Sequence, residues 1–435
     1  MFCKRRIIVE NRKFVIETLG CKVNSCESAS IEKYMIEHGF EKTEDNNADI
    51  YIINSCAVTG TSVEKARRLS ESQKKKNPEC IMVVCGCFPQ SFPEKAALNT
   101  VADIVTGNSE KHRIPDMIEE FMRNKTKIVK IGALPRVYDE RSAIPDENRT
   151  RAFIKIEDGC DRFCSYCIIP SARGRVRSLP VDEITNQAVR CVNDGHKELV
   201  LTGINLSCYG QEFGLSLADA VEAAAKSGVQ RLRLSSLEPE MLSDDIIERF
   251  KAVSSLCPHF HLSVQSGSDD VLKKMNRKYT TEQFARVVEK LRDAFPDCAI
   301  TTDIIAGFPM ESDEDFQKSI DFAKEMKFAK IHVFPFSVRI GTVAAEMPQL
   351  NPRIITERTR TLISQADVLE QEFLKKQVGS EQTVLIEKPK SPSYSHGFTE
   401  RYFSVRISGE NIPRHSLVRV KITGVREKYC VAKCL

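Results

Sequence analysis

The sequence of 435 residues has no apolar run approaching the roughly 20 residues that a membrane-spanning helix needs. It also has no low-complexity segment and no repeat beyond an alternation of strand and helix patterns. The first residues are basic, and their apolar stretch at 7–9 ends at Glu10, which makes it too short for a signal peptide. With 41% hydrophobic residues, the composition is not that of a disordered chain. These absences predict a globular protein of the cytoplasm with no membrane contact.

Cysteine, in contrast, is abundant, with 16 residues. Disulfide frameworks belong to small secreted chains, so clustered cysteines in a large cytoplasmic chain are more often metal ligands or catalytic residues. At ~150 residues per domain, the length predicts about three domains. The placement of the cysteines within these domains therefore bears on their role.

Residues 12–131 alternate short apolar runs with helical patterns. Strands are predicted at 13–18, 49–54, 81–85 and 102–107, with helices near 25–38, 60–76 and 112–123. Short apolar strands separated by helices are typical of a doubly wound parallel sheet. Residues 132–149 are polar, contain two prolines and are predicted to be a linker.

From residue 150 to 373 the alternation resumes with a longer spacing. Six strands are predicted, at 153–157, 198–203, 231–236, 261–266, 300–307 and 330–336. Six consecutive β/α units favour a partial parallel barrel, with its chemistry at the carboxyl ends of the strands. Residues 374–435 show short strands and turns, which indicates a small OB-like β-barrel. The predicted fold class is therefore α/β with a C-terminal β-barrel.

Three cysteines follow the first barrel strand in a C-x3-C-x2-C pattern: Cys160, Cys164 and Cys167. Zinc usually takes a fourth ligand, and no Cys or His lies within the next twenty residues. Three thiolates on one short loop suit a 4Fe–4S cluster with one iron left open for a substrate or cofactor. The alternatives are a zinc site or three unrelated buried thiols.

A second set of cysteines follows strands of the first domain. Cys21 follows the first strand, Cys56 the second, and Cys85 and Cys87 the third. In a parallel sheet these loops lie on one edge, so cysteines far apart in sequence can converge there. The alternative is a set of ordinary buried free cysteines.

The C-x3-C-x2-C loop, with Tyr166 before its last cysteine, resembles the radical SAM enzymes. In that superfamily the open iron binds S-adenosylmethionine (SAM), and one electron cleaves it to methionine and a 5′-deoxyadenosyl radical. The segments LGCKVN, NSCAVT and GCFPQ resemble the cysteine motifs of the methylthiotransferase family within this superfamily. That resemblance implies a second 4Fe–4S cluster held by Cys21, Cys56 and Cys87. Because Cys85 lies two residues before Cys87, either could be the third ligand, and the GC-aromatic-x-Gln pattern favours Cys87.

Further segments at 201–210, 231–239, 264–280, 303–309 and 332–342 are similar to this family, and each lies at or just after a predicted strand end. The resemblance implies two SAM molecules per turnover. The residues that it suggests as SAM contacts are Tyr166, Thr202, Gly203, Ser236, Glu238, Gln265, Ser266 and Asp303. The alternative for each is a capping or barrel-core polar residue.

The modest net charge of +4 is unevenly distributed. Residues 375–435 hold twelve Lys and Arg against five Asp and Glu, a charge of +7, which leaves −3 for the rest of the chain. Aromatic residues lie between these charges, at Tyr394, Phe398, Tyr402 and Phe403. Basic and aromatic side chains together suit looped RNA, through phosphate attraction and base stacking. The position also matches the RNA-binding TRAM domain of the family.

Lys22, Val23 and Asn24 in LGCKVN make the segment similar to the branch that acts on threonylcarbamoyladenosine beside the tRNA anticodon. The implied reaction inserts a methylthio group at C2 of that adenine, with an electron donor such as flavodoxin and a separate sulfur donor. The same chemistry on isopentenyladenosine or on an aspartate of a ribosomal protein is the alternative. An iron–sulfur redox or carrier protein and a non-catalytic RNA-binding protein are alternatives of different classes.

Overall fold

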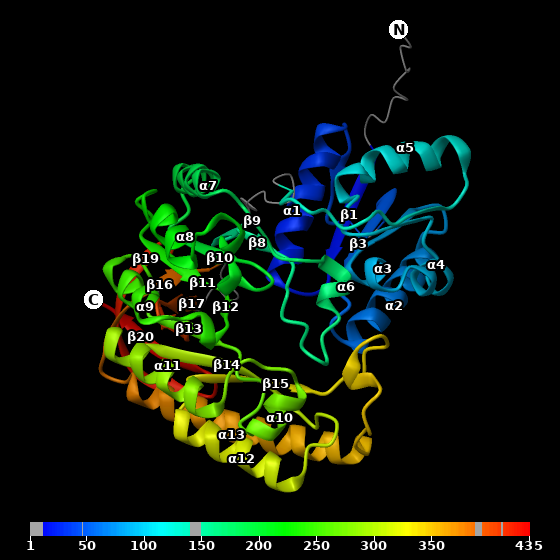
Figure 1. Ribbon diagram of the computed structural model, residues 1–435. Coiled ribbons are helices and arrows are strands. Elements are labelled where there is room, and N and C mark those ends of the chain that lie inside the picture. Colours follow the sequence, from blue (N-terminus) through cyan, green and yellow to red (C-terminus); the bar gives the residue numbers. More distant parts are fainter. Residues whose placement is uncertain (1–11, 46, 140–148, 388–393, 410–411) are drawn as a thin grey trace.

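The computed structural model describes residues 12–45, 47–139, 149–387, 394–409 and 412–435 (Figure 1). The basic residues 1–11, part of the predicted linker and the lysines at 388 and 390 lie outside these ranges. Three regions follow one another along the chain: an α/β domain, a barrel of β/α units and a small closed β-barrel. The predicted fold class is confirmed.

The N-terminal domain is built on a six-stranded parallel sheet in the order β2-β1-β3-β4-β5-β6. The strands are β1 (Lys13–Thr18), β2 (Glu41–Lys42), β3 (Ile50–Ser55), β4 (Ile81–Gly86), β5 (Ile104–Thr106) and β6 (Ile128–Lys130). The order reverses between β1 and β3, and ligands of doubly wound sheets bind at such a switch point. The edge strands β2 and β6 are only two and three residues long and were not predicted.

Helices cover both faces of this sheet. Helices α1 (Lys22–Glu37) and α5 (Ile114–Asn124), after the 3-10 turn η1 (Lys111–Arg113), pack on one face through Ile31, Met35 and Met117. Helices α2 (Gly60–Lys76), α3 (Cys87–Ser91) and α4 (Pro93–Asn99) pack on the other through Ala66, Phe88 and Ala96. Apolar residues on both strand faces are therefore buried, as a two-sided parallel sheet requires.

The barrel consists of two parallel sheets, β11-β10-β7 and β12-β13-β14-β15. Their strands are β7 (Ala152–Lys155), β10 (Glu198–Thr202), β11 (Arg231–Leu234), β12 (Ser236–Leu237), β13 (His259–Leu262), β14 (Ala299–Ala306) and β15 (Lys330–Pro335). The helices between and after them are α6 (Ile169–Arg173), α7 (Val181–Asn193), α8 (Leu217–Ala225), α9 (Asp244–Ala252), α10 (Asp269–Lys274), α11 (Thr281–Ala294), α12 (Asp313–Met326) and α13 (Pro352–Lys376). A small antiparallel pair, β8 (Glu157–Asp158) with β9 (Arg177–Ser178), brackets the cysteine loop.

The C-terminal strands form a closed barrel in the order β16-β17-β18-β20-β19. They are β16 (Glu381–Ile386), β17 (Tyr394–Thr399), β18 (Ser404–Ser408), β19 (Leu417–Arg426) and β20 (Tyr429–Cys434). Helix α13 joins the two barrels: Leu362 and Leu369 belong to the core of the β/α barrel, and Leu374 belongs to the core of the C-terminal barrel. No helix within the described ranges is both long and apolar enough to cross a membrane.

Candidate active site

The barrel triad (Cys160, Cys164 and Cys167) lies on the loop between β8 and α6. Gly159 begins this loop with a φ of +94°, where a Cβ would lie 2.0 Å from the Arg175 carbonyl oxygen, so only glycine fits. Phe163 also has a positive φ, of +49°, and the Cys167 amide donates to the Cys164 carbonyl over 3.0 Å. These turns fold a short segment tightly and keep its three cysteines on one loop.

Polar side chains from other loops of the barrel reach these sulfurs. Asn205 Nδ2 lies 3.6 Å from Cys160 Sγ, and Arg277 Nη1 lies 3.3 Å from Cys164 Sγ. The Asn205 amide N donates to the buried carboxyl of Glu157 over 2.7 Å, which fixes its position. Burial raises the pKa of Cys160 to about 11 and that of Cys167 to about 12. Such thiols stay neutral alone, but a bound metal deprotonates them, and the two donors would then stabilise thiolates.

The auxiliary triad (Cys21, Cys56 and Cys87) lies at the carboxyl edge of the N-terminal sheet, directly after β1, β3 and β4. A Cβ on Gly20, whose φ is +113°, would lie 2.8 Å from the Cys56 Cβ, which shows how closely the first two loops approach. Burial raises the pKa of Cys21, and the nearby Cys87 raises it further. Burial also raises the pKa of Cys56 to about 11, and both Cys87 and Cys21 contribute to this rise. The three thiols are therefore electrostatic neighbours, as the convergence of strand ends predicts.

Cys85 occupies a different environment. It lies within β4, fully buried in the apolar core among Phe14, Ile52 and Val83, and this burial raises the pKa of its thiol to about 12. Cys87 begins α3 and packs instead against Ala57, Ile168 and Ala172. Of the two, Cys87 is the one near Cys21 and Cys56.

The two triads are joined by direct contacts. Ile168 follows the last cysteine of the barrel triad and packs beside Cys87 of the auxiliary triad. Asn108 Nδ2 donates to the Ala172 carbonyl over 2.7 Å and lies 3.5 Å from Cys87 Sγ. Helix α6 therefore touches one triad while it directly follows the other, at the boundary between the two domains (Figure 1).

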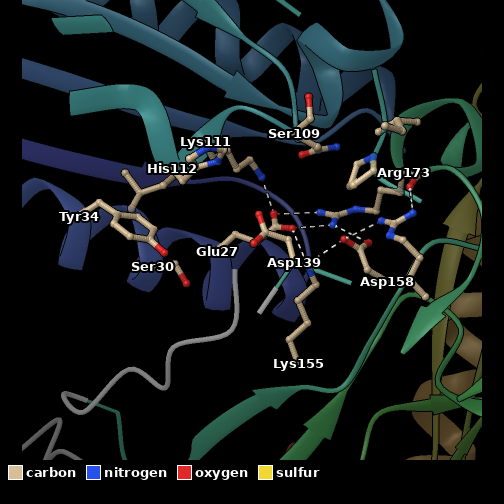
Figure 2. A pocket seen from close by; sticks show the side chains of 15 residues that line it. Glu27, Ser30, Tyr34, Ser109, Lys111, His112, Asp139, Lys155, Asp158 and Arg173 are labelled. Atoms are coloured by element: carbon tan, nitrogen blue, oxygen red, sulfur yellow. Dashed lines mark hydrogen bonds and ion pairs between the residues drawn. The ribbon is translucent and has the colours of Figure 1, made fainter. Parts of the chain in front are cut away.

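A buried ion network holds this boundary together. Glu27 of α1 pairs with Lys111, with Lys155 of β7 at 3.1 Å and with Arg173 of α6 at 2.7 Å (Figure 2). Asp158 pairs with Lys155 at 2.8 Å and with Arg173 at 3.0 Å. Arg177 also pairs with Asp158, at 3.3 Å, so four cations surround these two carboxylates. Arg173, Lys111 and Lys155 hold the pKa of Glu27 well below its usual range despite burial.

The same network reaches the auxiliary triad. Arg173 Nη2 donates to Asn24 Oδ1 over 3.0 Å, and Cys21 Sγ lies 3.4 Å from that oxygen. The positive charge of Arg173 opposes the effect of burial on the pKa of both Cys21 and Cys56. It is therefore suited to stabilise negative charge on sulfur at this site.

A cavity of about 710 Å³ opens between the three domains. The predicted residues in its wall are Cys21, Thr202, Gly203, Ser236 and Asp303. His261, Asp303 and His332 place their ring nitrogen and carboxylate oxygen atoms within 4.8 Å of one another there, and His261 Nε2 lies 3.2 Å from Asp303 Oδ2. The structure thus brings five of the predicted residues to one space large enough for a nucleoside.

The other predicted SAM contacts lie outside that wall. Tyr166 packs edge-on against Phe308 at 6.4 Å, and Glu238 pairs with Arg277, beside the barrel triad. Gln265 has a φ of +67°, a strained conformation for a non-glycine residue, and its amide donates to the Asp303 carbonyl. Ser266 is fully buried and its hydroxyl contacts Ser319 and the Ser268 amide.

The aromatic residues of the C-terminal barrel do not form one stacking surface. Phe403 is 7% exposed and packs in the barrel core, while Phe398 and Tyr402 stack on each other at 5.1 Å. Arg233 of β11 lies over Tyr402 at 4.6 Å and donates to the Glu400 carbonyl. These aromatic residues therefore belong to the interface and the cavity wall, and Tyr394 lies apart beside Arg406.

Several residues at the site were not singled out from the sequence, namely Glu27, Asn108, Arg173, Asn205 and Arg277. Asn205 and Arg277 lie within segments that resemble the family, but their contacts reach cysteines far away in the sequence. Only the three-dimensional arrangement identifies such partners.

Comparison with known proteins agrees with this arrangement. Residues 154–323 match the family model described as the radical SAM superfamily, and residues 375–435 match the TRAM domain. Residues 13–107, which include the auxiliary triad, match an uncharacterized protein family designated UPF0004.

Relatives resemble the chain over nearly its whole length. Threonylcarbamoyladenosine tRNA methylthiotransferase MtaB of Thermotoga maritima is 40% identical, over 93% of this chain and 94% of its own. The tRNA-2-methylthio-N(6)-dimethylallyladenosine synthase of Alkaliphilus oremlandii is 34% identical, over 96% of this chain and 91% of its own.

The fold alone is shared with a more distant solved structure. The radical S-adenosylmethionine methyltransferase TsrM of Kitasatospora setae superposes with a TM-score of 0.55 at 10% identity, over 77% of this chain and 74% of its own. The full-length similarity to the two tRNA-modifying relatives is what identifies the family. The chain belongs to the radical SAM methylthiotransferase family.

Proposed function

We propose that this protein inserts a methylthio group at C2 of N6-threonylcarbamoyladenosine beside the anticodon of tRNA. The observation that carries the proposal is the meeting of two cysteine triads at one domain boundary, next to a nucleoside-sized cavity that contains Cys21. Radical generation and sulfur delivery are separate tasks, so two neighbouring metal sites suit a reaction that couples them. The 40% identity with an MtaB protein supports the choice of the adenosine.

The residues present fit two 4Fe–4S clusters. Each triad supplies three free thiols, which is the donor set of a 4Fe–4S cluster with one iron left open. We propose that the barrel triad holds the cluster that binds SAM and that the auxiliary triad, with Cys87 rather than Cys85, holds the second cluster. Bound SAM, reduced through the barrel cluster, would supply the radical that activates C2.

Polar side chains of the protein surround the sulfurs of the barrel triad. Asn205 and Arg277 donate toward the barrel sulfurs, and such hydrogen bonds tune the reduction potential of a cluster. Arg277 is in turn held by Glu238 and by Tyr279, whose hydroxyl lies 3.0 Å from its Nε. Removal of one donor should therefore shift the potential without removing iron.

We propose that the predicted SAM contacts keep their assigned role. Tyr166 lies within the loop of the barrel triad, and Glu238 pairs with Arg277 beside it. Gln265 and Ser266 lie on the loop after β13, whereas Thr202, Gly203, Ser236 and Asp303 line the cavity. Gln265 is the strongest of the residues outside the cavity wall, since backbone strain is retained mostly where a function requires it. Two SAM molecules are expected per turnover, one as the methyl source and one as the radical source.

We propose that each domain has a separate role. Residues 12–131 deliver sulfur, 132–149 connect, 150–373 generate the radical and 374–435 bind tRNA. The +7 charge of the last segment supports binding of RNA phosphates. An unpaired base of the anticodon loop can be turned into the cavity at little cost. An electron donor such as flavodoxin, a sulfur donor and a cytoplasmic location complete the proposal.

Mass spectrometry of tRNA nucleosides from cells with and without the gene tests the function. We expect 2-methylthio-threonylcarbamoyladenosine to disappear in the deletion strain and to return with the wild-type gene but not with the Cys160→Ala gene. Loss of the methylthio group from isopentenyladenosine, or from a ribosomal-protein aspartate, would instead support the other substrates.

Two assays address the other classes of function. An iron–sulfur carrier would not cleave SAM to 5′-deoxyadenosine under anaerobic reducing conditions. A non-catalytic RNA-binding protein would not contain the roughly eight irons per chain that two 4Fe–4S clusters require.

A further inference from the structure

The cavity between the domains is lined by both aromatic and polar side chains. The aromatic side chains are Phe334 of β15 together with Phe373, Phe398, Tyr402 and Phe403. Polar groups come from the start of α1 and from β13, β14 and β15. Aromatic side chains suit the face of a base, while polar groups suit its substituents.

Four long cationic side chains line this cavity, and three of them already have partners. Lys330 pairs with Glu370 at 3.2 Å, Lys428 with Asp367 at 2.7 Å, and Arg401 with Asp297 at 3.9 Å. The side-chain ammonium of Lys22 makes no hydrogen bond or ion pair with any residue that the structure describes. The acid that attracts it, Glu198, is occupied by Arg151, Arg231 and Arg233.

Lys22 also holds a special position in the chain. It directly follows Cys21 of the auxiliary triad, as the first residue of α1, and both residues line the cavity. The imidazole of His332 lines the same cavity, is exposed and lies within the electrostatic range of Lys22. Its neighbours Asp303 and His261 are bound to each other. The cavity therefore offers one uncompensated cation, which directly follows Cys21, and one exposed imidazole.

We propose that Lys22, assisted by His332, binds the carboxylate of the threonylcarbamoyl substituent and so selects the modified adenosine. This assignment rests on the proposed function. Positions 2 and 6 of adenine flank N1 on one edge of the ring, so a carboxylate on the N6 substituent held by Lys22 keeps C2 near Cys21. An isopentenyl group has no carboxylate to pair with the Lys22 ammonium, so it gains no affinity from this contact.

A phosphate of the tRNA backbone has the same charge and is the competing occupant of this site. The two sources are distinguished with anticodon stem-loops that carry threonylcarbamoyladenosine, its methyl ester or unmodified adenosine. Only the first has the carboxylate, whereas all three have the same phosphates. Binding is measured by fluorescence anisotropy with the reconstituted protein in the absence of SAM.

We expect wild-type protein to bind the carboxylate stem-loop roughly 30-fold more tightly than the ester, because the ester cannot form the charge pair with Lys22. Lys22→Gln should bind the carboxylate form as weakly as the ester, and leave affinity for the ester unchanged. Lys22→Arg should recover part of the preference, and His332→Ala should lose part of it. Lys42→Gln, a surface lysine paired with Glu32, is the matched control and should retain the full preference.

Iron content and circular dichroism of each variant must match the wild type before affinities are compared. Equal weakening of all three ligands by Lys22→Gln would overturn the proposal in favour of a phosphate contact. A wild-type protein that binds acid and ester equally would also overturn it. Failure of the proposed function has a different signature, since wild-type protein would then methylthiolate isopentenyladenosine but not threonylcarbamoyladenosine.

Discussion

The guanidinium of Arg173 meets the carboxylate of Glu27 in a buried ion pair, with 2.7 Å between Nη1 and Oε1. Arg173 ends the helix that follows the barrel triad, and Glu27 lies on the helix that begins beside Cys21. One ion pair thus connects the segments that hold the two triads. The relative position of the two sites depends on buried charges, and buried charges are sensitive to the loss of a partner.

Glu27→Ala should destabilise the protein strongly, because three buried cations lose their shared carboxylate. We expect the free energy of unfolding, measured in urea by circular dichroism on apo-protein, to fall by about 3–5 kcal/mol. Glu37→Ala, on the same helix but in an exposed 4.0 Å pair with Lys33, is the control and should change it by less than about 1 kcal/mol. Equal effects of the two substitutions would contradict the structural role of the network.

The network also predicts a loss of stability in acid. Charged neighbours, led by Lys155 and Arg173, lower the pKa of Asp158 to about 2 in spite of burial, and its ordinary value is 3.8. A carboxylate whose folded-state pKa is depressed stabilises the fold above the unfolded pKa, and that contribution disappears as the pH falls through the folded value. Stability should therefore decline by roughly 2 kcal/mol from this group between about pH 5 and pH 2.

Thermal unfolding of apo-protein across this pH range measures the effect. Asp158→Asn should be less stable at pH 7 and should show a flatter acid limb than the wild type. Glu37→Gln, an exposed substitution, should follow the wild-type curve. A variant curve parallel to that of the wild type would show that Asp158 does not contribute to the acid limb.

Substitution of the two neighbouring cysteines should separate their roles. Cys87→Ala is expected to lower the iron content after anaerobic reconstitution from about eight to about four per chain, whereas Cys85→Ala should retain about eight. Cys85→Ala should instead lower stability by about 1 kcal/mol, since it removes one buried atom from the core. Retention of all iron in the Cys87→Ala protein would assign the ligand to Cys85.

Gly20→Ala should disrupt the auxiliary site without removing any of its cysteines. Its φ of +113° and the 2.8 Å approach of a Cβ to Cys56 force the two loops apart. We expect the iron content to fall to about four per chain while SAM still binds. Gly39→Ala is the matched control, since its φ is +86° but no atom lies within 4 Å, so it should cost about 1 kcal/mol and no iron.

Gln265 offers a test of the SAM site. Gln265→Ala removes the side chain but keeps the left-handed backbone, while Gln265→Gly also relieves the strain, so the glycine variant should be about 1 kcal/mol more stable than the alanine variant. Both should weaken SAM binding about tenfold, as measured by equilibrium dialysis on protein with full iron content. Unchanged SAM binding in both variants would exclude a contact by this side chain.

Local sequence was sufficient for most of the fold. Runs rich in Val and Ile predicted β1 at its exact bounds and β3, β4 and β10 within a residue or so, because buried parallel strands need continuous apolar sequence. Strand β13 was predicted too late in the chain, at 261–266 instead of His259–Leu262, because Val264 continues the apolar pattern after pairing has changed. Gln265 there forms only an isolated bridge with Ile304.

The cysteines of the site were predictable because their spacing, or their position after a strand, is a local property. Their partners were not. Asn108 and Arg173 act through contacts between domains, and Lys22 differs from other surface lysines only in what surrounds it. The pattern of basic and aromatic residues also could not show that Phe403 lies inside the barrel. Residues of a strand alternate between the inside and the outside of a closed barrel, and which set faces inward is not known until the strand register is known.

Helix α13 has a mechanical consequence for the enzyme. It contains neither glycine nor proline after Pro352, runs for 25 residues and packs along β15, so it is a stiff rod roughly 38 Å long. Its far end is fixed in the core of the C-terminal barrel, and its flank lies against the strand that carries His332. A force exerted on that barrel by a docked RNA would therefore be transmitted through α13 to the wall of the cavity that we propose receives the base.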